Sequence, residues 1–475
     1  MYAGATISDG MLCLYAVASQ AVQQDVSKTG KLYISGAGSK QGKTKNCFLR
    51  VQMDQISRTE VENAFLRLSE RIGEKTVDKL VLAVGKETLQ QRTDREQLLR
   101  LCRQLVQIEA VEQVSLTAAE TVLFCRDWQR ENGRGYSGYL LLFRLSEHGA
   151  QAELLKIKEQ KNLIFREESV KIEVPLAGLE SKFYSRTAAE ALSTSPERLT
   201  AGRQAELVNA ARRTINANRM AINQIFDEYG TGCPEDLEIE LKDQNWREKH
   251  APLTCRHILT AYEAVIQPKL AQLLKSVERE LREKNVPWSS RRQSQFRLAF
   301  EGGLSNCWLV QKQVADFFRL STMDARLSRI NRQGLLEIHS GAMGASMLAA
   351  GRMEMGMLSP CDVTILSQDE EGKQVRDTVV KRHQLLAWGR INYPLWPGDG
   401  QPVTYLINPG EAIRVELDWK GGQKKREYAL QLTQLGSWTA RLGLSLNEQG
   451  KWSLHGVRCD PDTGSCQGEE EIVPL

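Results

Sequence analysis

The sequence of 475 residues predicts an α/β protein that is followed by an antiparallel β region. In the first part of the chain, short apolar runs alternate with segments whose apolar residues recur every three or four positions, which indicates strands alternating with amphipathic helices. Past about residue 360 the helical period disappears, and apolar residues alternate with polar ones between turns rich in Asn, Pro and Gly. A chain of this length can form two or three domains, each with its own core.

The elements of the first part are predicted in order from these two patterns. The opening alternates small and apolar residues as far as Val17, which indicates strands. The apolar residues of the segment 58–72 have helical spacing. The expected strands are 31–35, 47–53, 77–84, 111–115, 138–143 and 152–157, the last two as a hairpin, and the expected helices are 58–72 and 94–108.

The middle of the chain is predicted to be mainly helical, from about 180 to 285, with one strand near 237–241. Within it, residues 269–284 have apolar side chains at helical spacing and charges between them, so we expect an amphipathic helix with a solvated face. A partner surface is the alternative for that face. A helix rich in Gly, Ala and Met is expected through 325–358. Strands are expected at 412–419 and 438–446.

Composition excludes several classes of protein. Net charge is +4, from 63 basic and 59 acidic residues, which gives no electrostatic reason to expect nucleic acid as the main partner. The N-terminus lacks the features of a signal peptide, and no apolar run approaches the roughly 20 residues needed to span a bilayer. The ten cysteines have no framework spacing. We therefore expect a cytoplasmic protein with reduced thiols and no membrane partner.

The segment 298–318 is the most informative part of the chain. An apolar run ends in Gly302 and Gly303, and an amphipathic helix pattern follows. Glycines there let a backbone approach a ligand, and a helix start offers free N–H groups, although a Gly-Gly pair alone usually marks only a turn. The segment resembles the adenosine-binding segment of the DnaK-type (seventy-kilodalton heat-shock) chaperones, where G-G-S-T-R-I-P precedes V-Q-K and D-F-F. Here V-Q-K stands at 310–312 and D-F-F at 316–318.

Other segments resemble the same family in the same order. The resemblance implies an actin-like two-lobed nucleotide-binding domain over 1–358 with a shortened subdomain near 18–58, a linker over 359–385, and a β-sandwich domain of the substrate-binding type over 386–475. The matching segments are 115–119 with E-P-T-A-A, 212–214 with K-R-T, 344–346 with G-A-A, 362–366 with the interdomain linker, and 446–455 with the D-A-D-G-I-L-H-V turn.

The chain departs from the family where phosphate would be held. The first phosphate loop, D-L-G-T-T-N, aligns with 6–11, where the metal-organising carboxylate has no counterpart unless Asp9 replaces it. The second, D-L-G-G-G-T, aligns with 144–149, where an aspartate has become Arg144 and Glu147 adds a charge that repels phosphate. The subdomain that carries the family's catalytic lysine is shortened. Since phosphoryl transfer depends on positioning and charge neutralisation, we expect no catalytic residue and no resident metal.

A weak nucleotide site is what the resemblance leaves. Asn306 replaces the arginine that helps to sandwich adenine, and Arg212 and Arg213 would retain part of that surface. We expect at most weak binding of ATP or ADP, and Mg²⁺ only together with nucleotide. The implied cofactor-binding residues are Gly4, Asp9, Gly10, Arg212, Arg213, Gly302, Gly303, Ser305 and Asn306.

The implied function is the binding of unfolded or partner polypeptide with weak or lost ATP hydrolysis. In the family, the sandwich holds extended apolar peptide through backbone hydrogen bonds and an apolar pocket. Two alternatives stay open. One is an active ATP-dependent chaperone with rebuilt phosphate loops, in which Asp9 serves the metal. The other is a non-catalytic actin-like scaffold that binds one specific partner.

Several further motifs are interpreted as structural. The segment 36–44 resembles a phosphate-binding P-loop, but five residues, not the required four, separate Gly36 from the Gly-Lys pair at 42–43. It is better explained as the tip of a hairpin. Cys459 and Cys466 flank an expected β-hairpin and lack the second pair that zinc requires. The six histidines have no metal spacing, and His455 is expected in a strand. Most tryptophans of the β region should be core, with one or two lining a peptide groove.

Overall fold

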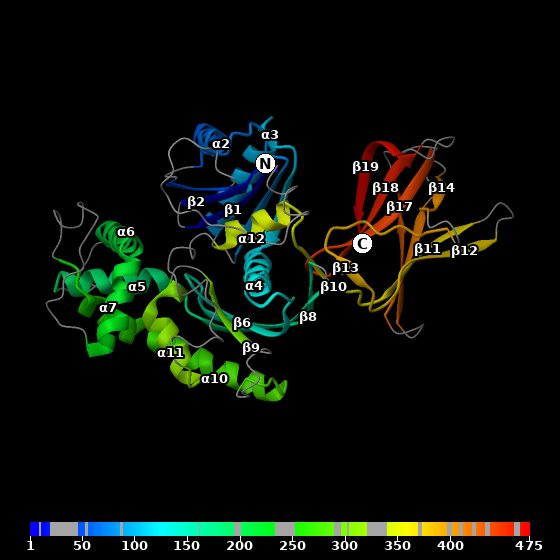
Figure 1. The fold of residues 1–475 in the computed structure, drawn as a ribbon. Coiled ribbons are helices and arrows are strands. Elements are labelled where there is room, and N and C mark those ends of the chain that lie inside the picture. The colour runs from blue at the N-terminus through cyan, green and yellow to red at the C-terminus, as the bar shows by residue number, and fades with distance from the viewer. Residues whose placement is uncertain are drawn as a thin grey trace. The chain divides into compact units, whose positions relative to one another are not determined.

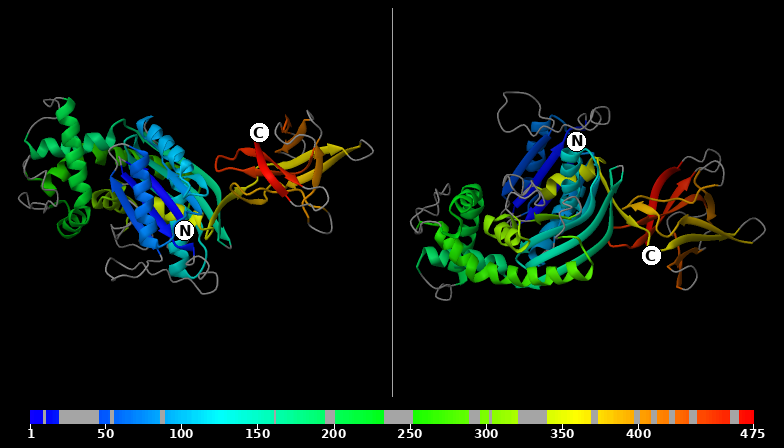
Figure 2. Two further views of the ribbon diagram at one scale, coloured as in Figure 1. Left: turned by 90° about the horizontal axis from the view of Figure 1, so that it is seen from above. Right: turned by 60° about the horizontal axis from the view of Figure 1, so that its bottom comes forward.

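The structure is a computed structural model, shown as a ribbon in Figures 1 and 2. Its elements are labelled in Figure 1. It describes residues 1–8, 11–19, 46–52, 56–85, 89–160, 162–193, 201–232, 252–288, 296–301, 304–320, 340–368, 373–396, 401–407, 412–419, 424–432, 438–459 and 466–475.

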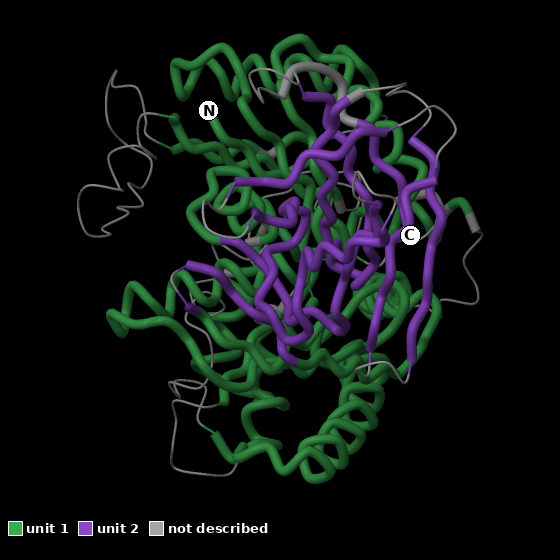
Figure 3. The backbone as a smooth tube through the Cα atoms, turned by 90° about the vertical axis from the view of Figure 1, so that its right-hand side faces the viewer, with its two compact units in different colours: residues 1–159, 168–353 green, residues 160–167, 354–475 purple. Residues whose placement is uncertain are grey.

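The chain divides into two compact units, which Figure 3 colours separately. Unit 1 contains Met1–Glu159 and Glu168–Met353, and unit 2 contains Gln160–Glu167 and Glu354–Leu475. The mixed α/β class predicted from the sequence is confirmed.

Unit 1 begins with a five-stranded sheet in the order β3-β2-β1-β4-β5. The strand β2 is antiparallel to both of its neighbours, β1 and β3, whereas β4 and β5 run parallel to β1. One half of the sheet, β3-β2-β1, is therefore antiparallel, and the other half, β1-β4-β5, is parallel. The strands are β1 Tyr2–Ser8, β2 Met11–Val17, β3 Asn46–Gln52, β4 Lys79–Val84 and β5 Val111–Ser115.

Helices cover both faces of this sheet (Figure 1). Alternate residues of β4 separate the two layers: Leu80 and Leu82 belong to one apolar cluster, and Val81 and Ala83 to another. The first cluster contains α2 and α3, and the second contains α4 and α12. The helices are α2 Arg58–Ile72, α3 Leu89–Gln104, α4 Leu116–Asn132 and α12 Ser340–Ala349. Successive side chains of a strand point to opposite faces of its sheet, so helices pack on both faces. The sheet and the helices on either side of it form three layers.

A seam of small residues joins α12 to β1 and α4. A Cβ atom added at Gly4 would lie 2.0 Å from the carbonyl oxygen of Ala342, and one at Gly344 would lie 1.9 Å from that of Ala119. Such distances are far inside van der Waals contact, so a side chain at either position would push the backbones apart. Gly4, which was predicted to contact a cofactor, therefore has a packing role that requires no ligand.

The second sheet of unit 1 repeats part of the first. Four of its six described strands lie in the order β8-β7-β6-β9, as β3-β2-β1-β4 do in the first sheet. The strand β6 is antiparallel to β7, as expected for the 138–157 hairpin, and parallel to β9. The strands are β6 Ser137–Ser146, β7 Gly149–Gln160, β8 Leu163–Pro175 and β9 Phe296–Glu301.

One apolar cluster packs a group of helices on this sheet, and Figures 1 and 2 show them gathered beside it. The amphipathic helix expected at 269–284 is confirmed as α10, since Leu270, Leu273, Leu274, Val277 and Leu281 are its buried residues. The helices are α5 Leu179–Ala191, α6 Ala201–Ala217, α7 Arg219–Tyr229, α9 Cys255–Ala261, α10 Gln267–Glu283 and α11 Trp308–Phe317, with the short helix η4 Leu304–Asn306.

Unit 2 contains two four-stranded antiparallel sheets, in the orders β12-β11-β15-β16 and β14-β17-β18-β19. A single apolar cluster draws on both, for example through Val363 and Val415 of the first and Leu442 and Leu454 of the second. The strands are β11 Asp362–Gln368, β12 Gln374–Val380, β14 Thr404–Ile407, β15 Ile413–Asp418, β16 Lys425–Leu430, β17 Trp438–Leu446, β18 Trp452–Cys459 and β19 Cys466–Pro474.

The structure differs from the sequence predictions in two places. The stretch 359–385, predicted as a linker, contains β11 and β12, because Val363 and Ile365 are buried in the core of unit 2. The helix predicted through 325–358 ends at Ala349, and β10 (Glu354–Leu358) follows. The absence of a side chain at Gly356 permits the pairing of β10 with β13 (Leu385–Ala387), since a Cβ atom there would lie 2.3 Å from the carbonyl oxygen of Leu386.

Some predictions lie outside the described residues: the strands at 31–35 and 237–241, the P-loop-like segment 36–44, and the stretch 325–339. Among the helices that are described, none combines the length and the apolar character that crossing a membrane requires.

Candidate functional site

Three segments that the family resemblance places around phosphate and adenosine meet at the end of β6. The guanidinium Nη2 of Arg144 donates a hydrogen bond to Thr117 Oγ1 at 3.2 Å. The backbone N–H of Leu145 donates to Ser305 Oγ at 2.6 Å, and Ser305 is fully buried. The segments 115–119, 144–149 and 304–306, far apart in the sequence, are therefore neighbours in unit 1.

Glu147 lies in the two-residue turn between β6 and β7, where Ser146 pairs with Gly149. Its carboxylate accepts a hydrogen bond from the backbone N–H of Ser181 at 2.9 Å. Its carbonyl oxygen accepts from the N–H groups of Gly178 at 2.8 Å and Leu179 at 3.4 Å. Glu147 therefore occupies the N-terminus of α5.

The reason for this arrangement is local. The residue before α5 is Gly178, in a left-handed conformation with φ +75°, and it has no side chain to cap the helix. The first N–H groups of a helix lack partners within the helix, and they attract negative charge. Glu147 supplies both the missing acceptors and the charge. The position where an anionic ligand would bind a helix N-terminus is therefore filled by the chain's own carboxylate.

The β6–β7 turn is also tightly packed. Gly149 has φ +126°, and a Cβ atom there would lie 2.3 Å from the carbonyl oxygen of Val174 at the end of β8. The N–H of Leu176 donates to the carbonyl oxygen of His148 at 3.1 Å. The glycine thus lets the turn contact the β8–α5 connection and holds Glu147 at the helix end.

A buried carboxylate lies behind Arg144. Glu153 of β7 is 4% exposed, and it accepts hydrogen bonds from Thr117 Oγ1 at 3.1 Å and from Ser169 Oγ at 2.6 Å. Because Arg144 also donates to Thr117, a polar chain links α4, β6, β7 and β8. Burial of a charge is tolerated only with such partners. Sequence analysis missed this residue, and the only signal was a lone glutamate within an apolar strand.

The start of α11 is capped as well. The backbone N–H of Trp308 donates to Asn223 Oδ1 at 2.8 Å, and its indole N–H donates to Asp227 Oδ1 at 2.9 Å. The indole ring stacks on Phe226 with 6.2 Å between ring centroids. The expectation that this helix start offers free N–H groups is thus wrong for Trp308, whose amide is bound by α7.

The two arginines expected near adenosine lie in different environments on α6. The guanidinium carbon of Arg212 is 5.4 Å from the ring centroid of Tyr184, a residue of the helix that Glu147 caps. Arg213 is exposed. Arg212 therefore lies beside α5, and Ser305 lies beside the end of β6. Arg213 faces solvent. Asn306 is the last residue of η4. The other predicted site residues, Asp9, Gly10, Gly302 and Gly303, lie outside the described residues.

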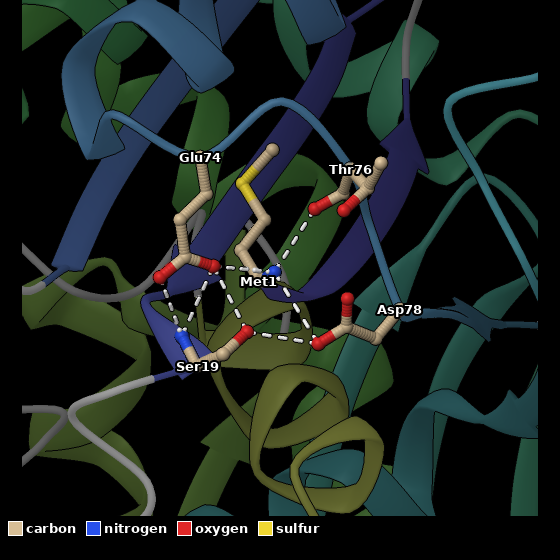
Figure 4. Close-up of polar contacts among 5 residues, drawn as sticks. All are labelled: Met1, Ser19, Glu74, Thr76 and Asp78. Carbon is tan, nitrogen blue, oxygen red and sulfur yellow. Dashed lines mark hydrogen bonds and ion pairs between the residues drawn. The ribbon is translucent and has the colours of Figure 1, made fainter.

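A second polar cluster surrounds the α-ammonium group of Met1 (Figure 4). This nitrogen lies 2.6 Å from Glu74 Oε2 and 3.4 Å from Asp78 Oδ2, and it donates to the carbonyl oxygen of Thr76 at 2.9 Å. Ser19 donates to Glu74 through its N–H at 2.9 Å and to Asp78 through its hydroxyl at 2.8 Å. Sequence analysis missed this cluster because its members lie far apart in the chain.

These contacts shift the titration of Glu74. Burial works to raise the pKa of its carboxyl, but the Met1 ammonium and the two hydrogen bonds from Ser19 outweigh burial and lower that pKa below its ordinary value of 4.5. The carboxylate is therefore charged over the whole neutral range and remains available to the ammonium.

The described residues offer no other chemistry of this kind. No group of three or more His, Cys, Asp or Glu among them is placed to hold a metal ion. Burial raises the pKa of the Cys102 thiol to about 12 and that of Cys361 to about 11, so neither is a thiolate at neutral pH. His455 lies in β18 as predicted, with Nε2 2.7 Å from Ser445 Oγ.

No protein-family model matches this chain, and no curated protein matches it.

Proposed function

We propose that this chain binds polypeptide through a β-sandwich domain of the DnaK-chaperone type, which follows an actin-like two-lobed domain that has lost rapid ATP hydrolysis. The observation that supports this most is the carboxylate of Glu147 at the N-terminus of α5. In the family that the sequence resembles, a glycine-rich loop at the corresponding position leaves room for phosphate.

The repeated sheet order supports the two lobes. The orders β3-β2-β1-β4 and β8-β7-β6-β9 are equivalent, and each begins with an antiparallel hairpin followed by a parallel strand. The turns of the two hairpins, β1–β2 and β6–β7, are the segments that align with the family's two phosphate loops. Unit 2 supports the sandwich, since two antiparallel sheets share one apolar cluster.

The charges around the β6–β7 turn support the proposed loss of hydrolysis. A phosphate oxygen about 4 Å from Glu147 would meet a repulsion of about 1 kcal/mol in water, and about 4 kcal/mol near a protein surface. The second carboxylate there, Glu153, is buried, and Arg144 donates to Thr117 beside it. Phosphoryl transfer needs donors and cations around the phosphate, whereas the carboxylate of Glu147 occupies the helix end beside this turn.

Exposed apolar side chains beside an edge strand support polypeptide binding. Among the described strands of unit 2, β14 is the last of its sheet, and its Leu406 is 73% exposed. Leu395 and Trp396 are 57% and 51% exposed, and they precede β14 across the bridge from Leu395 to Pro402. An extended chain can add to such an edge through main-chain hydrogen bonds, with its side chains on the apolar residues.

Nucleotide binding is tested by calorimetric titration of the full-length protein with ATP and ADP, with and without Mg²⁺. We expect dissociation constants of about 1 mM or weaker, because the helix end is already occupied. The variant Glu147→Gly frees the N–H of Ser181 and should bind nucleotide more tightly than the original chain. Tight binding and single-turnover hydrolysis that Asp9→Ala abolishes would instead establish the active ATP-dependent chaperone.

Polypeptide binding is tested with fluorescein-labelled, reduced and carboxymethylated lactalbumin, which is permanently unfolded. We expect an anisotropy increase with the full-length protein, and weaker binding for Leu406→Asp. The matched control is Leu66→Asp, which changes a 50% exposed leucine on α2 of unit 1. No binding of the unfolded probe, together with a pull-down that returns one stoichiometric partner, would favour the scaffold alternative.

A further inference from the structure

An open pocket of about 410 Å³ lies between α3 and β5 of unit 1. Arginines dominate its lining, and Leu99 forms an apolar part of its wall. Its lining includes Arg95, Leu99, Arg100 and Arg103 of α3 and Gln113 of β5, and we call it the α3–β5 groove.

The lining of the groove contains more basic than acidic side chains. Its three arginines face a single acid, Glu96, in the lining. Arg95 donates to Gln113 at 3.1 Å and lies 3.8 Å from Glu96. Arg100 and Arg103 are exposed, and neither forms an ion pair with any residue in the described ranges. With a net charge of only +4 over 475 residues, such a concentration is not a consequence of general basicity.

The shape of the groove suits an extended chain. From Arg95 to Arg103 the helix advances roughly 12 Å. An extended polypeptide rises roughly 3.3 Å per residue and directs alternate side chains to the same side, so acids at every second position cover this distance within four or five residues. Leu99, which lines the groove between the arginines, is 5% exposed and belongs to the core of unit 1, so it forms the floor of the groove.

The strand beside the groove can take part in binding. Among the described strands, β5 is the last of its sheet, so its outer edge has no neighbour there. An edge strand presents main-chain N–H and C=O groups to an added chain. The acid on this strand, Glu112, lies 2.6 Å from Lys79 and is already paired, so it does not oppose an acidic ligand.

We propose that the α3–β5 groove binds an extended acidic segment of a partner polypeptide. A single phosphate would engage only part of a row of this length. Single-stranded nucleic acid relies on aromatic faces for base stacking, and the lining contains none. The groove is in unit 1, so this inference does not depend on the peptide edge proposed for unit 2.

The test measures fluorescence anisotropy of a labelled twelve-residue peptide of alternating Glu and Val with the full-length protein at low salt. The double variant Arg100→Gln with Arg103→Gln should weaken binding about two- to thirtyfold, the range for two exposed ion pairs. The matched control, Arg92→Gln, changes an exposed arginine of the same helix outside the lining and should change affinity less than about twofold.

Four outcomes would overturn the proposal. They are absence of binding, an equal loss in Arg92→Gln, equal binding of the peptide with Gln in place of Glu, and a single-stranded oligonucleotide or inorganic phosphate that binds more tightly with the same arginine dependence. The double variant should still bind unfolded lactalbumin as the original chain does. That comparison separates failure of this inference from failure of the proposed polypeptide binding in unit 2.

Discussion

Two carboxylates of unit 1, Glu147 and Glu74, both accept hydrogen bonds from backbone N–H groups, but they face different kinds of positive charge. Glu147 binds the N–H of Ser181 at a helix end, where aligned peptide dipoles amount to about half an elementary charge. Glu74 binds the N–H of Ser19 and also lies 2.6 Å from the ammonium group of Met1, which carries a full charge and is buried.

The difference shows what each carboxylate is needed for. A buried ammonium without counter-charge is strongly unfavourable, so the fold depends on Glu74 and Asp78. The N–H groups at a helix end can instead bind water or an anion, so α5 can form without the Glu147 side chain. We therefore expect Glu74 to contribute more to stability than Glu147, whose carboxylate occupies the helix end at α5.

The largest effect is expected from the double variant Glu74→Gln with Asp78→Asn. It leaves the Met1 ammonium without a negative partner and should lower the free energy of unfolding by roughly 2 to 3 kcal/mol, since both carboxylates are partly exposed. Urea denaturation measures this loss, and hydrogen exchange should show faster opening in β1. The control Glu70→Gln changes an exposed glutamate of α2 and should be neutral.

The second prediction is that acid reduces the contribution of Glu74 to the stability of the fold. The pKa of Glu74 is lowered in the folded state, so its contribution is fully present above 4.5 and is lost as pH falls through the folded pKa. The stability difference between the original chain and Glu74→Gln should therefore be constant at neutral pH and shrink below pH 4.5. Urea denaturation at a series of pH values measures it, and a difference that grows in acid would contradict the assigned ammonium contact.

The smallest stability effect is expected for Glu147→Gln. The amide keeps an acceptor for Ser181 and loses only the charge at the helix end, so about 0.5 to 1 kcal/mol should be lost. If this variant were destabilised as much as the Glu74 and Asp78 double variant, the contrast between the two carboxylates would be wrong. Urea denaturation under identical conditions compares them directly.

Local patterns predicted much of the fold. The buried residues of α2 and α10 are those that helical spacing selects, and the β6–β7 hairpin was predicted at nearly its observed position. Patterns failed where long-range pairing decides. The Met-rich run at 354–358 was predicted as the end of a helix, but it forms β10 because it pairs with β8 and β13. The supposed linker forms strands because the core of unit 2 buries their apolar residues.

The candidate site was predictable only in outline. The resemblance pointed to the segments around Thr117, Arg144 and Ser305, which are neighbours in the structure. It did not reveal that Glu147 caps α5, because Ser181 lies 34 residues further along the chain. For the same reason no local pattern indicates the Met1 cluster, since Ser19 and Glu74 are separated by 55 residues.

The glycine seam between β1, α4 and α12 has a consequence for reading mutational scans of this chain. Substitutions at Gly4 and Gly344 should score among the least tolerated, as invariant loop glycines do in nucleotide-dependent enzymes. Here the intolerance arises from carbonyl oxygens of Ala342 and Ala119 that would lie 2.0 and 1.9 Å from a new Cβ atom. Intolerance at Gly4 is therefore a marker of helix-to-strand distance and at Gly344 of helix-to-helix distance, and neither should be counted as evidence for a bound nucleotide.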